Sequence, residues 1–233
     1  MRISVIIPAA GQGTRMKSAV PKQFLRLRGK SILRHAVEAF EKSGVVDSAV
    51  LVAPLQDVDR TREEWLGSSG IVQRVVPGGA KRQDSVYQGL KALDADVDIV
   101  VVHDGARPFV GRRVIRECVD AAREYGAAIA AIPVSDTVKR ASPQGLVDQT
   151  VDRKGLWRVQ TPQAFQYALF REAMEKAIAD SYYGTDEGSL IEYIGKTVKI
   201  VPGSELNIKI TRPEDLILGE AIAAAGNFFE NED

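Results

Sequence analysis

Short runs rich in β-branched residues alternate along this chain with segments of helical periodicity, and this rhythm constrains the fold more than any other feature. The runs lie at about 3–7, 49–53, 71–76, 99–102 and 127–134. The run at 99–102 is continuously apolar, which is typical of a central strand in a parallel sheet. Amphipathic patterns over about 32–44, 57–66, 86–93 and 114–125 separate the runs. Alternating strands and helices predict a mostly parallel sheet with helices on both faces.

The alternation of strands and helices ends after Val134. Residues 135–157 have no helical period and predict two strands, Thr137–Arg140 and Leu146–Asp152, joined by a turn at 143–145. An isolated hairpin is marginally stable in water, so this one must pack on its own domain or on another subunit.

The α/β pattern then returns. Helices are expected over 170–178 and 189–194, and strands over 198–201 and 206–210. A capping box at 211–214, with proline at the first helical position, begins a last helix. We predict one α/β domain over residues 1–233, a Rossmann-like three-layer sandwich with a mostly parallel mixed sheet. A β-hairpin arm at 135–157 protrudes from it.

Charge and cysteine content exclude several classes of protein. Lys plus Arg and Asp plus Glu each total 31 in 233 residues, so no bulk charge favours nucleic acid or membrane surfaces. Cys118 is the single cysteine, which leaves no disulfide framework and no cysteine zinc site. The first apolar run is too short for a signal peptide, and none reaches the roughly 18 residues of a membrane helix. We expect a cytoplasmic protein.

A glycine-containing loop directly after the first strand is the strongest functional signal. Residues 8–16 read Pro-Ala-Ala-Gly-Gln-Gly-Thr-Arg-Met, and Pro-Lys-Gln follows at 21–23. Gly11 and Gly13 allow backbone amides to approach a ligand and form an anion nest. Arg15 and Lys22 add positive charge. The pattern predicts a phosphate-binding loop that is neither the dinucleotide fingerprint nor the P-loop.

Two further motifs follow later strands, where ligands of parallel sheets bind. Residues 78–86 read Gly-Gly-Ala-Lys-Arg-Gln-Asp-Ser-Val, and residues 103–108 read His-Asp-Gly-Ala-Arg-Pro. Asp104 stands at the end of the central strand and is a natural Mg²⁺ ligand beside a triphosphate. His103 is interpreted as a structural residue.

These motifs together resemble a known group of enzymes. The opening loop is similar to that of the sugar-phosphate nucleotidylyltransferases, and Pro-Lys-Gln narrows the resemblance to the cytidylyltransferases acting on methylerythritol phosphate or ribitol phosphate. Asp-Thr-x-Lys, Arg-x-x-Leu-Trp, Thr-Pro-Gln and Asn-Ile-Lys-x-Thr-x-Pro-Glu-Asp follow in the family's order, from about Ile6 to Leu216. The resemblance implies transfer of CMP from CTP to a polyol phosphate, with release of pyrophosphate.

The resemblance also implies roles for individual residues. Many relatives have Asp where this chain has Ala80. The arm crosses to a second subunit in relatives, so a homodimer is expected in which Thr137 and Arg153 act in trans. Asp104 would bind Mg²⁺. The implied catalytic residues are Arg15, Lys22, Arg153 and Lys209. The implied CTP contacts are Ala9, Ala10, Gly11, Gly13, Arg15, Lys22, Gly79, Ser85 and Asp104. The implied acceptor contacts are Asp104, Arg107, Thr137, Arg153, Thr161, Thr185 and Lys209.

The expected chemistry is direct attack of an acceptor phosphate oxygen on the α-phosphorus of CTP. A phosphate monoester is ionised near neutral pH, because its second pKa is about 6, so no general base is needed. Three alternatives stay open: a ribitol-5-phosphate cytidylyltransferase, a nucleotide-sugar glycosyltransferase and a non-catalytic nucleotide sensor. The glycosyltransferase needs an Asp-x-Asp after a strand, whereas Asp94-Ala95-Asp96 precedes one. A sensor would be expected to lose Arg15, Lys22 or Asp104.

Overall fold

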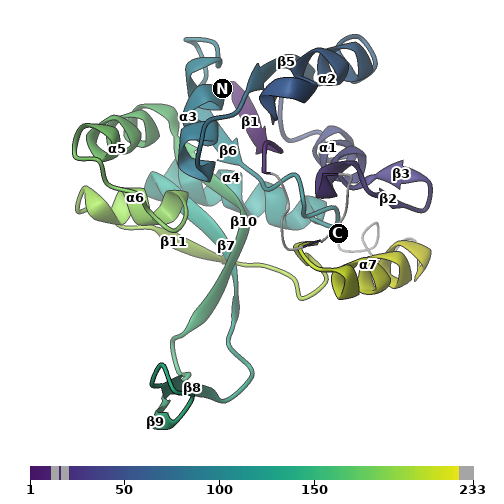
Figure 1. The fold of residues 1–233 in the computed structure, drawn as a ribbon. Helices are drawn as coiled ribbons and strands as arrows, with labels where there is room; N and C mark the ends of the chain where they lie inside the picture. Colours follow the sequence, from purple (N-terminus) through teal and green to yellow (C-terminus); the bar gives the residue numbers. More distant parts are fainter. Residues whose placement is uncertain (12–15, 17–20, 226–233) are drawn as a thin grey trace.

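A seven-stranded sheet forms the centre of the protein. The computed structural model describes residues 1–11, 16 and 21–225, without the side chain of Lys22. Strand order is β11-β7-β10-β6-β1-β4-β5, and only β10 runs antiparallel to its neighbours (Figure 1). The strands are β1 (Ile3–Pro8), β4 (Ser48–Ala53), β5 (Val72–Pro77), β6 (Ile99–Val102), β7 (Ala127–Pro133), β10 (Trp157–Gln166) and β11 (Lys199–Pro202). The predicted α/β fold with a mostly parallel mixed sheet is confirmed.

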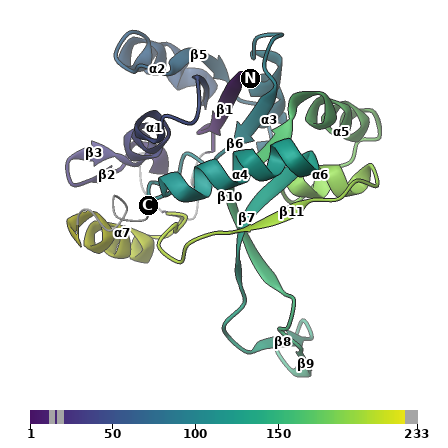
Figure 2. The same ribbon diagram turned by 180° about the vertical axis from the view of Figure 1, so that it is seen from behind.

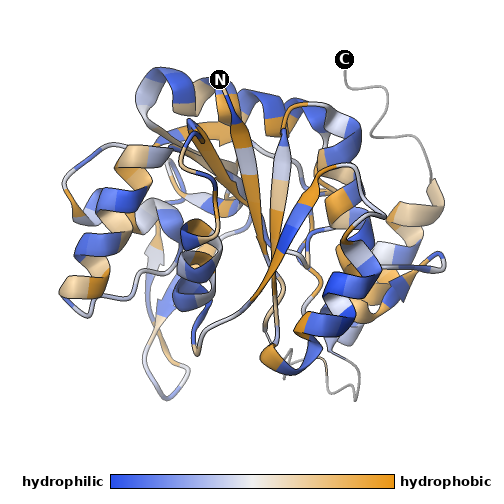
Figure 3. Ribbon diagram, turned by 90° about the horizontal axis from the view of Figure 1, so that it is seen from above, coloured by the Kyte–Doolittle hydropathy of each residue, from blue (hydrophilic) through white to orange (hydrophobic). Residues whose placement is uncertain are grey.

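Helices cover both faces of this sheet. In β1, Val5 and Ile7 pack into one core cluster and Ile6 into the other, as the two-residue period of a strand requires. Figures 2 and 3 show the resulting layers, with apolar strands between amphipathic helices. The first face carries α1 (Ile32–Ser43), α2 (Val58–Trp65) and α4 (Arg112–Tyr125). The second carries α3 (Arg82–Lys91), α5 (Tyr167–Ala179) and α6 (Glu187–Tyr193).

Strand β10 was not predicted from the sequence. It lies between β6 and β7 and has Pro162 in its middle, and proline argues against a central strand because it cannot donate to the ladder. The structure accommodates Pro162 at an irregularity, since the pairing with β7 shifts register between Val159 and Gln163. Gln163 then pairs with Val102 at the end of β6. The motif at 160–163 is thereby brought beside Asp104.

The predicted strand at 206–210 is wrong. This segment is irregular, because its polar groups bond elsewhere: the Asn207 side-chain amide donates to Thr161 O at 2.8 Å, and Ile210 N donates to Ala106 O at 2.8 Å. Ile208 and Ile210 nevertheless pack against α7 (Pro213–Ala225), with Leu27. Lys209 lies between them in sequence and lines a cavity on the other side.

Helix α7 begins at Pro213, as predicted, but its cap differs from the expected one. The Asp215 carboxylate, rather than Glu214, accepts from the backbone amides of Thr211 and Arg212, each at 2.8 Å. The strands β2 (Arg26–Leu27) and β3 (Lys30–Ser31) form a small separate sheet, and β2 contacts α7. Short 3-10 turns lie at Lys22–Phe24, before β2, and at Leu55–Asp57, before α2.

The segment between β7 and β10 is a hairpin that stands away from the sheet (Figures 1 and 2). Its strands are β8 (Val138–Ala141) and β9 (Val147–Val151), each close to its predicted bounds. Gly145 has φ +81° in the turn, a conformation that glycine adopts without steric cost. Across the described ranges, no helix is long and apolar enough to cross a membrane.

Candidate active site

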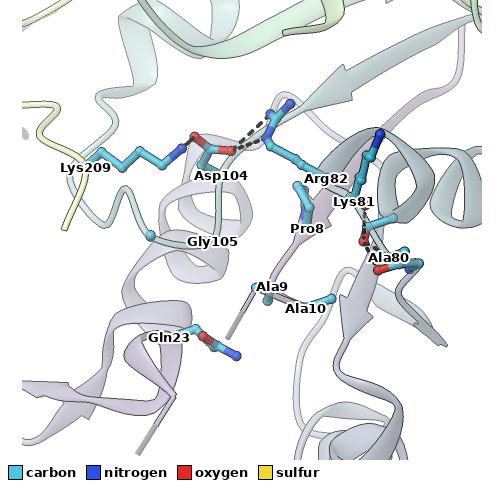
Figure 4. A pocket seen from close by; sticks show the side chains of 14 residues that line it. Pro8, Ala9, Ala10, Gln23, Ala80, Lys81, Arg82, Asp104, Gly105 and Lys209 are labelled. Atoms are coloured by element: carbon cyan, nitrogen blue, oxygen red, sulfur yellow. Dashed lines mark hydrogen bonds and ion pairs between the residues drawn. The ribbon is translucent and has the colours of Figure 1, made fainter. Parts of the chain in front are cut away.

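A cavity of about 550 Å³ opens where β1 and β6 end (Figure 4). Parallel sheets bind ligands at this edge because their loops converge there. Six predicted CTP contacts line it: Ala9, Ala10, Gly11, Gly79, Ser85 and Asp104. The remaining lining residues are Pro8, Gln23, Ala80, Lys81, Arg82, Gly105, Ala106 and Lys209.

The loop after β5 packs tightly against the loop after β1. Gly78 N donates to Ala53 O at 2.8 Å, and a Cβ added at Gly78 would lie 2.2 Å from the Ala10 Cβ. The Ser85 hydroxyl closes the loop, since it accepts from Gly79 N and donates to Lys81 O, each at 3.1 Å. Only glycine allows this approach, so the two walls of the cavity hold each other in place.

Asp104 is the electrostatic centre of the site. Its Oδ1 accepts from Arg82 Nε at 3.0 Å, and its Oδ2 lies 2.6 Å from Lys209 Nζ (Figure 4). Arg107 Nε lies 3.8 Å from Oδ2. Burial by itself would raise the pKa of Asp104, but attraction from Arg82 and Lys209 outweighs it and holds the pKa well below its usual range. Asp104 is therefore a carboxylate at physiological pH.

A second cavity, of about 390 Å³, adjoins the first. Arg82, Asp104 and Lys209 line both cavities. The predicted acceptor contacts Arg107, Thr161 and Thr185 line the second one, together with Ile129, Val159, Gln160, Gln163, Asp186, Gly188, Ser189 and Glu192. Two ligands bound side by side would therefore meet at Asp104.

A buried network behind Asp104 fixes the second cavity. The Thr161 hydroxyl accepts from Asp104 N at 3.1 Å and bonds to His103 Nδ1 at 3.1 Å. His103 Nε2 bonds to Arg107 O at 3.0 Å, and Arg107 donates to Asn207 O at 2.6 Å. Burial lowers the pKa of His103 to about 4, so the ring is neutral at physiological pH. Burial and bonds at both ring nitrogens agree with the interpretation of His103 as a structural residue.

Five predicted residues are not placed at the cavities. Gly13 and Arg15 lie outside the described residues, as does the Lys22 side chain. Thr137 and Arg153 are exposed on the arm and line neither cavity, and Arg153 donates to Ser135 O instead. Within their own subunit these two arm residues do not meet the other predicted acceptor contacts.

The sequence analysis did not assign Arg82, Glu187 or Gln163 to the site. Arg82 belongs to the motif after β5, where its position was equally consistent with an ordinary helix start. Glu187 follows a motif residue, Thr185, and pairs with Arg82 at 2.6 Å. Gln163 accepts from Gly188 N at 3.0 Å and donates to Asp186 at 2.8 Å. The available signal was that each of these charged or amide side chains lies within a motif or close beside a motif residue.

Two other acidic residues serve a different purpose. Asp94 and Asp96 each pair with Arg2 at 2.7 Å, before β6 begins and therefore at the opposite edge of the sheet from Asp104. They tie the chain's start to the α3–β6 connection. Asp94 and Asp96 line neither cavity, so they do not form the metal-binding Asp-x-Asp that a glycosyltransferase needs at its nucleotide site.

Comparisons with known proteins agree with the geometry. A family model described as 2-C-methyl-D-erythritol 4-phosphate cytidylyltransferase matches residues 3–225. The enzyme of that name from Geobacillus kaustophilus is 48% identical over 229 residues, which cover 97% of this chain and 98% of the relative. The one from Syntrophus aciditrophicus is 44% identical, with 94% and 95% covered.

Solved structures give the same result. The crystal structure of 2-C-methyl-D-erythritol 4-phosphate cytidylyltransferase from Thermus thermophilus is similar with a TM-score of 0.81 and 35% identity, covering 96% of this chain and all of that one. The 4-diphosphocytidyl-2C-methyl-D-erythritol synthase from Anaerococcus prevotii gives a TM-score of 0.83 and 33% identity, with 96% and 98% covered. The chain belongs to the 2-C-methyl-D-erythritol 4-phosphate cytidylyltransferase family.

Proposed function

We propose that this protein transfers CMP from CTP to 2-C-methyl-D-erythritol 4-phosphate, giving 4-diphosphocytidyl-2-C-methyl-D-erythritol and pyrophosphate for isoprenoid precursor synthesis. Family membership supports the reaction. The structural observation that carries it is the pair of adjoining cavities with Arg82, Asp104 and Lys209 on their shared boundary. CTP would occupy the larger cavity and the polyol phosphate the smaller one.

The proposed reaction is a direct displacement. The acceptor phosphate is already ionised near neutral pH, and its oxygen attacks the α-phosphorus of CTP while the bond to the pyrophosphate oxygen breaks. The enzyme's contribution is then positioning and charge neutralisation. Lys209, at the boundary of the cavities, would aim the acceptor phosphate. Arg15 and Lys22 would hold the triphosphate, as the sequence resemblance implies.

Magnesium is the proposed cofactor, with Asp104 as its protein ligand. Among the residues that the structure describes, no group of three or more His, Cys, Asp or Glu could hold a metal ion by itself. A single carboxylate still fits Mg²⁺, which uses one or two carboxylates together with substrate phosphates. The oxygens of Asp104 accept from Arg82 and Lys209, yet a carboxylate has about four acceptor sites. Bound Mg²⁺ would neutralise charge on the phosphates.

We further propose a homodimer in which each arm completes the site of its partner. The support is the arm's exposed apolar surface: Leu146 is 70% exposed and Val147 62% exposed. Val159, 42% exposed, lies beyond the arm's base and lines the acceptor cavity. A partner's arm placed there would cover this surface and bring Thr137 and Arg153 to the acceptor. The cytoplasmic location stays a prediction from the sequence.

Pyrophosphate release with CTP and Mg²⁺ tests the reaction. We expect release with 2-C-methyl-D-erythritol 4-phosphate and little with ribitol 5-phosphate, and loss of the signal in Lys22→Ala. Release only with ribitol 5-phosphate would keep the mechanism and change the acceptor. Folded protein that binds CTP but releases no pyrophosphate with either acceptor would contradict the proposal and favour a nucleotide sensor.

Mixed dimers test whether the arm acts in trans. Lys22→Ala and Arg153→Ala are each expected to be nearly inactive. If Arg153 serves the partner's site, a mixed dimer of the two variants contains one intact site, and mixing should restore activity. If Arg153 serves its own subunit, every site in the mixture carries a defect and activity should stay low, which would contradict the trans arrangement.

A further inference from the structure

Four charged side chains of alternating sign cross the boundary between the two cavities. Glu187 contacts Arg82 at 2.6 Å, Arg82 contacts Asp104 at 3.0 Å, and Asp104 contacts Lys209 at 2.6 Å. Glu187 begins α6, Arg82 begins α3, Asp104 follows β6 and Lys209 precedes α7. This series of ion pairs therefore joins four segments that are distant in sequence, at the point where the two ligands would meet.

Glu187 is the member of this series of ion pairs that faces the protein interior. The residue is 1% exposed. One carboxylate oxygen contacts Arg82, and the other has no hydrogen-bond partner in the described part of the chain. A buried carboxylate costs free energy unless it is paired. The contact with Arg82 therefore has to offset the burial of the Glu187 carboxylate.

Arg82 differs from Glu187 in being open to ligands. Its side chain is 33% exposed and lines both cavities. Nε and one terminal nitrogen bind Asp104, while the other terminal nitrogen binds Glu187. Two fixed carboxylates on different edges of a planar guanidinium leave it one orientation. A guanidinium has five N–H donors, so these three contacts leave two on a side chain that lines both cavities.

We propose that Glu187 is a positioning residue for nucleotidyl transfer, which holds the Arg82 guanidinium at the junction of the two cavities so that Arg82 contacts the reacting phosphates. This inference rests on the proposed function. In it, Glu187 touches no ligand and acts through Arg82, whereas Arg82 is a catalytic residue. The pair would also connect the two binding steps, because Arg82 directly follows the loop that lines the nucleotide cavity and Glu187 directly follows Thr185 and Asp186 at the acceptor cavity.

The test compares Glu187→Gln with the wild-type protein by steady-state pyrophosphate release. The substitution keeps the shape and one possible hydrogen bond but removes the charge that fixes Arg82. We expect kcat to fall about tenfold to hundredfold, the usual range for losing a supporting partner or misplacing a group by about 1 Å. The KM for CTP should stay within about twofold, since the Gly79 and Ser85 contacts remain. Glu175→Gln, at an exposed pair with Arg171 on α5, is the matched control.

A double mutant distinguishes positioning from general damage. If Glu187 acts only through Arg82, then Glu187→Gln added to Arg82→Met should lower kcat no further, because effects transmitted through one shared partner are not additive. Multiplied losses in the double mutant would overturn the proposal. If Glu187→Gln does not fold, Glu187→Asp replaces it as the test. The shorter side chain keeps the charge but withdraws it from Arg82, and the variant should show the same fall in kcat at unchanged KM for CTP.

The outcomes separate this inference from the proposed function. A wild-type protein without pyrophosphate release would refute the function itself. An active wild-type protein with Glu187→Gln at full kcat would refute the positioning role and leave the function intact. A Glu187→Gln variant that loses kcat only in proportion to a lowered thermal midpoint would also overturn the proposal, because that pattern indicates a purely structural role.

Discussion

The close approach of the two nucleotide-binding loops makes Gly78→Ala a sharp test of the site's geometry. A Cβ at Gly78 would lie 2.2 Å from the Ala10 Cβ and 2.9 Å from the Ser85 hydroxyl. Ordinary contact begins near 3.4 Å, so the loops must separate by about 1.2 Å. The Ala10 methyl cannot rotate away, because it is fixed to the backbone.

Displacement on this scale has two measurable costs. Inserting a methyl group into a tightly packed contact destabilises a protein by about 1–3 kcal/mol, which at this chain length lowers the thermal midpoint by roughly 2–12 °C. A misplacement of about 1 Å at a reacting group costs about 100-fold in rate. We therefore expect kcat/KM for CTP to fall by about that factor, measured as pyrophosphate release at saturating acceptor.

A control separates the two costs. Gly44 ends α1 with φ +62° and has nothing within 4 Å of an added Cβ, so Gly44→Ala should cost about 1–2 kcal/mol through backbone strain alone. Its kcat/KM for CTP should match that of the wild-type protein. If Gly78→Ala retained wild-type kcat/KM for CTP, the tight contact of the two loops would not position the nucleotide, and the reasoning would be refuted.

Three further predictions follow from buried and charged groups. The folded state holds the pKa of His103 at about 4, below the usual 6.5, so the unfolded chain binds more protons between these values and stability falls as pH drops from 6.5 toward 4. Urea unfolding should give a free energy of unfolding about 2 kcal/mol lower at pH 4.5 than at pH 7 from this group. His103→Gln should lack this contribution; a variant with the same difference between the two pH values as the wild-type protein would contradict the lowered pKa of His103. Cys118 is buried, and burial raises the pKa of its thiol. Mass spectrometry should therefore detect no alkylation of Cys118 in the folded protein at pH 8 and full alkylation in urea. Rapid alkylation of the folded protein would contradict the burial of Cys118. Chelation of Mg²⁺ should abolish pyrophosphate release, and Asp104→Asn should raise the Mg²⁺ concentration needed for half-maximal activity; an unaltered Mg²⁺ requirement would exclude Asp104 as the ligand.

The sequence determined the fold class and most of the site. The apolar runs at 3–7, 49–53 and 99–102 occur as β1, β4 and β6 within about a residue of their expected bounds, because strands buried on both faces leave a local hydrophobic signal. The loops that follow β1, β5 and β6 carry the motifs. Since all parallel strands point their carboxyl ends to one edge, the order of strands was enough to expect these loops beside one another. The family resemblance then singled out Gly79 and Ser85 within them.

Tertiary structure alone decided how the remaining groups meet. Strand β10 carries Pro162, which local propensity assigns to a loop, and only the register shift against β7 makes room for it. The segment around Lys209 reads as a strand, yet its Asn207 is bonded to Thr161 and it joins no sheet. The contact between Glu187 and Arg82 spans 105 residues. Periodicity and spacing report neighbours along the chain, whereas an ion pair between distant segments depends on where the whole sheet places them. That is why the sequence named Asp104 and Lys209 but neither Arg82 nor Glu187.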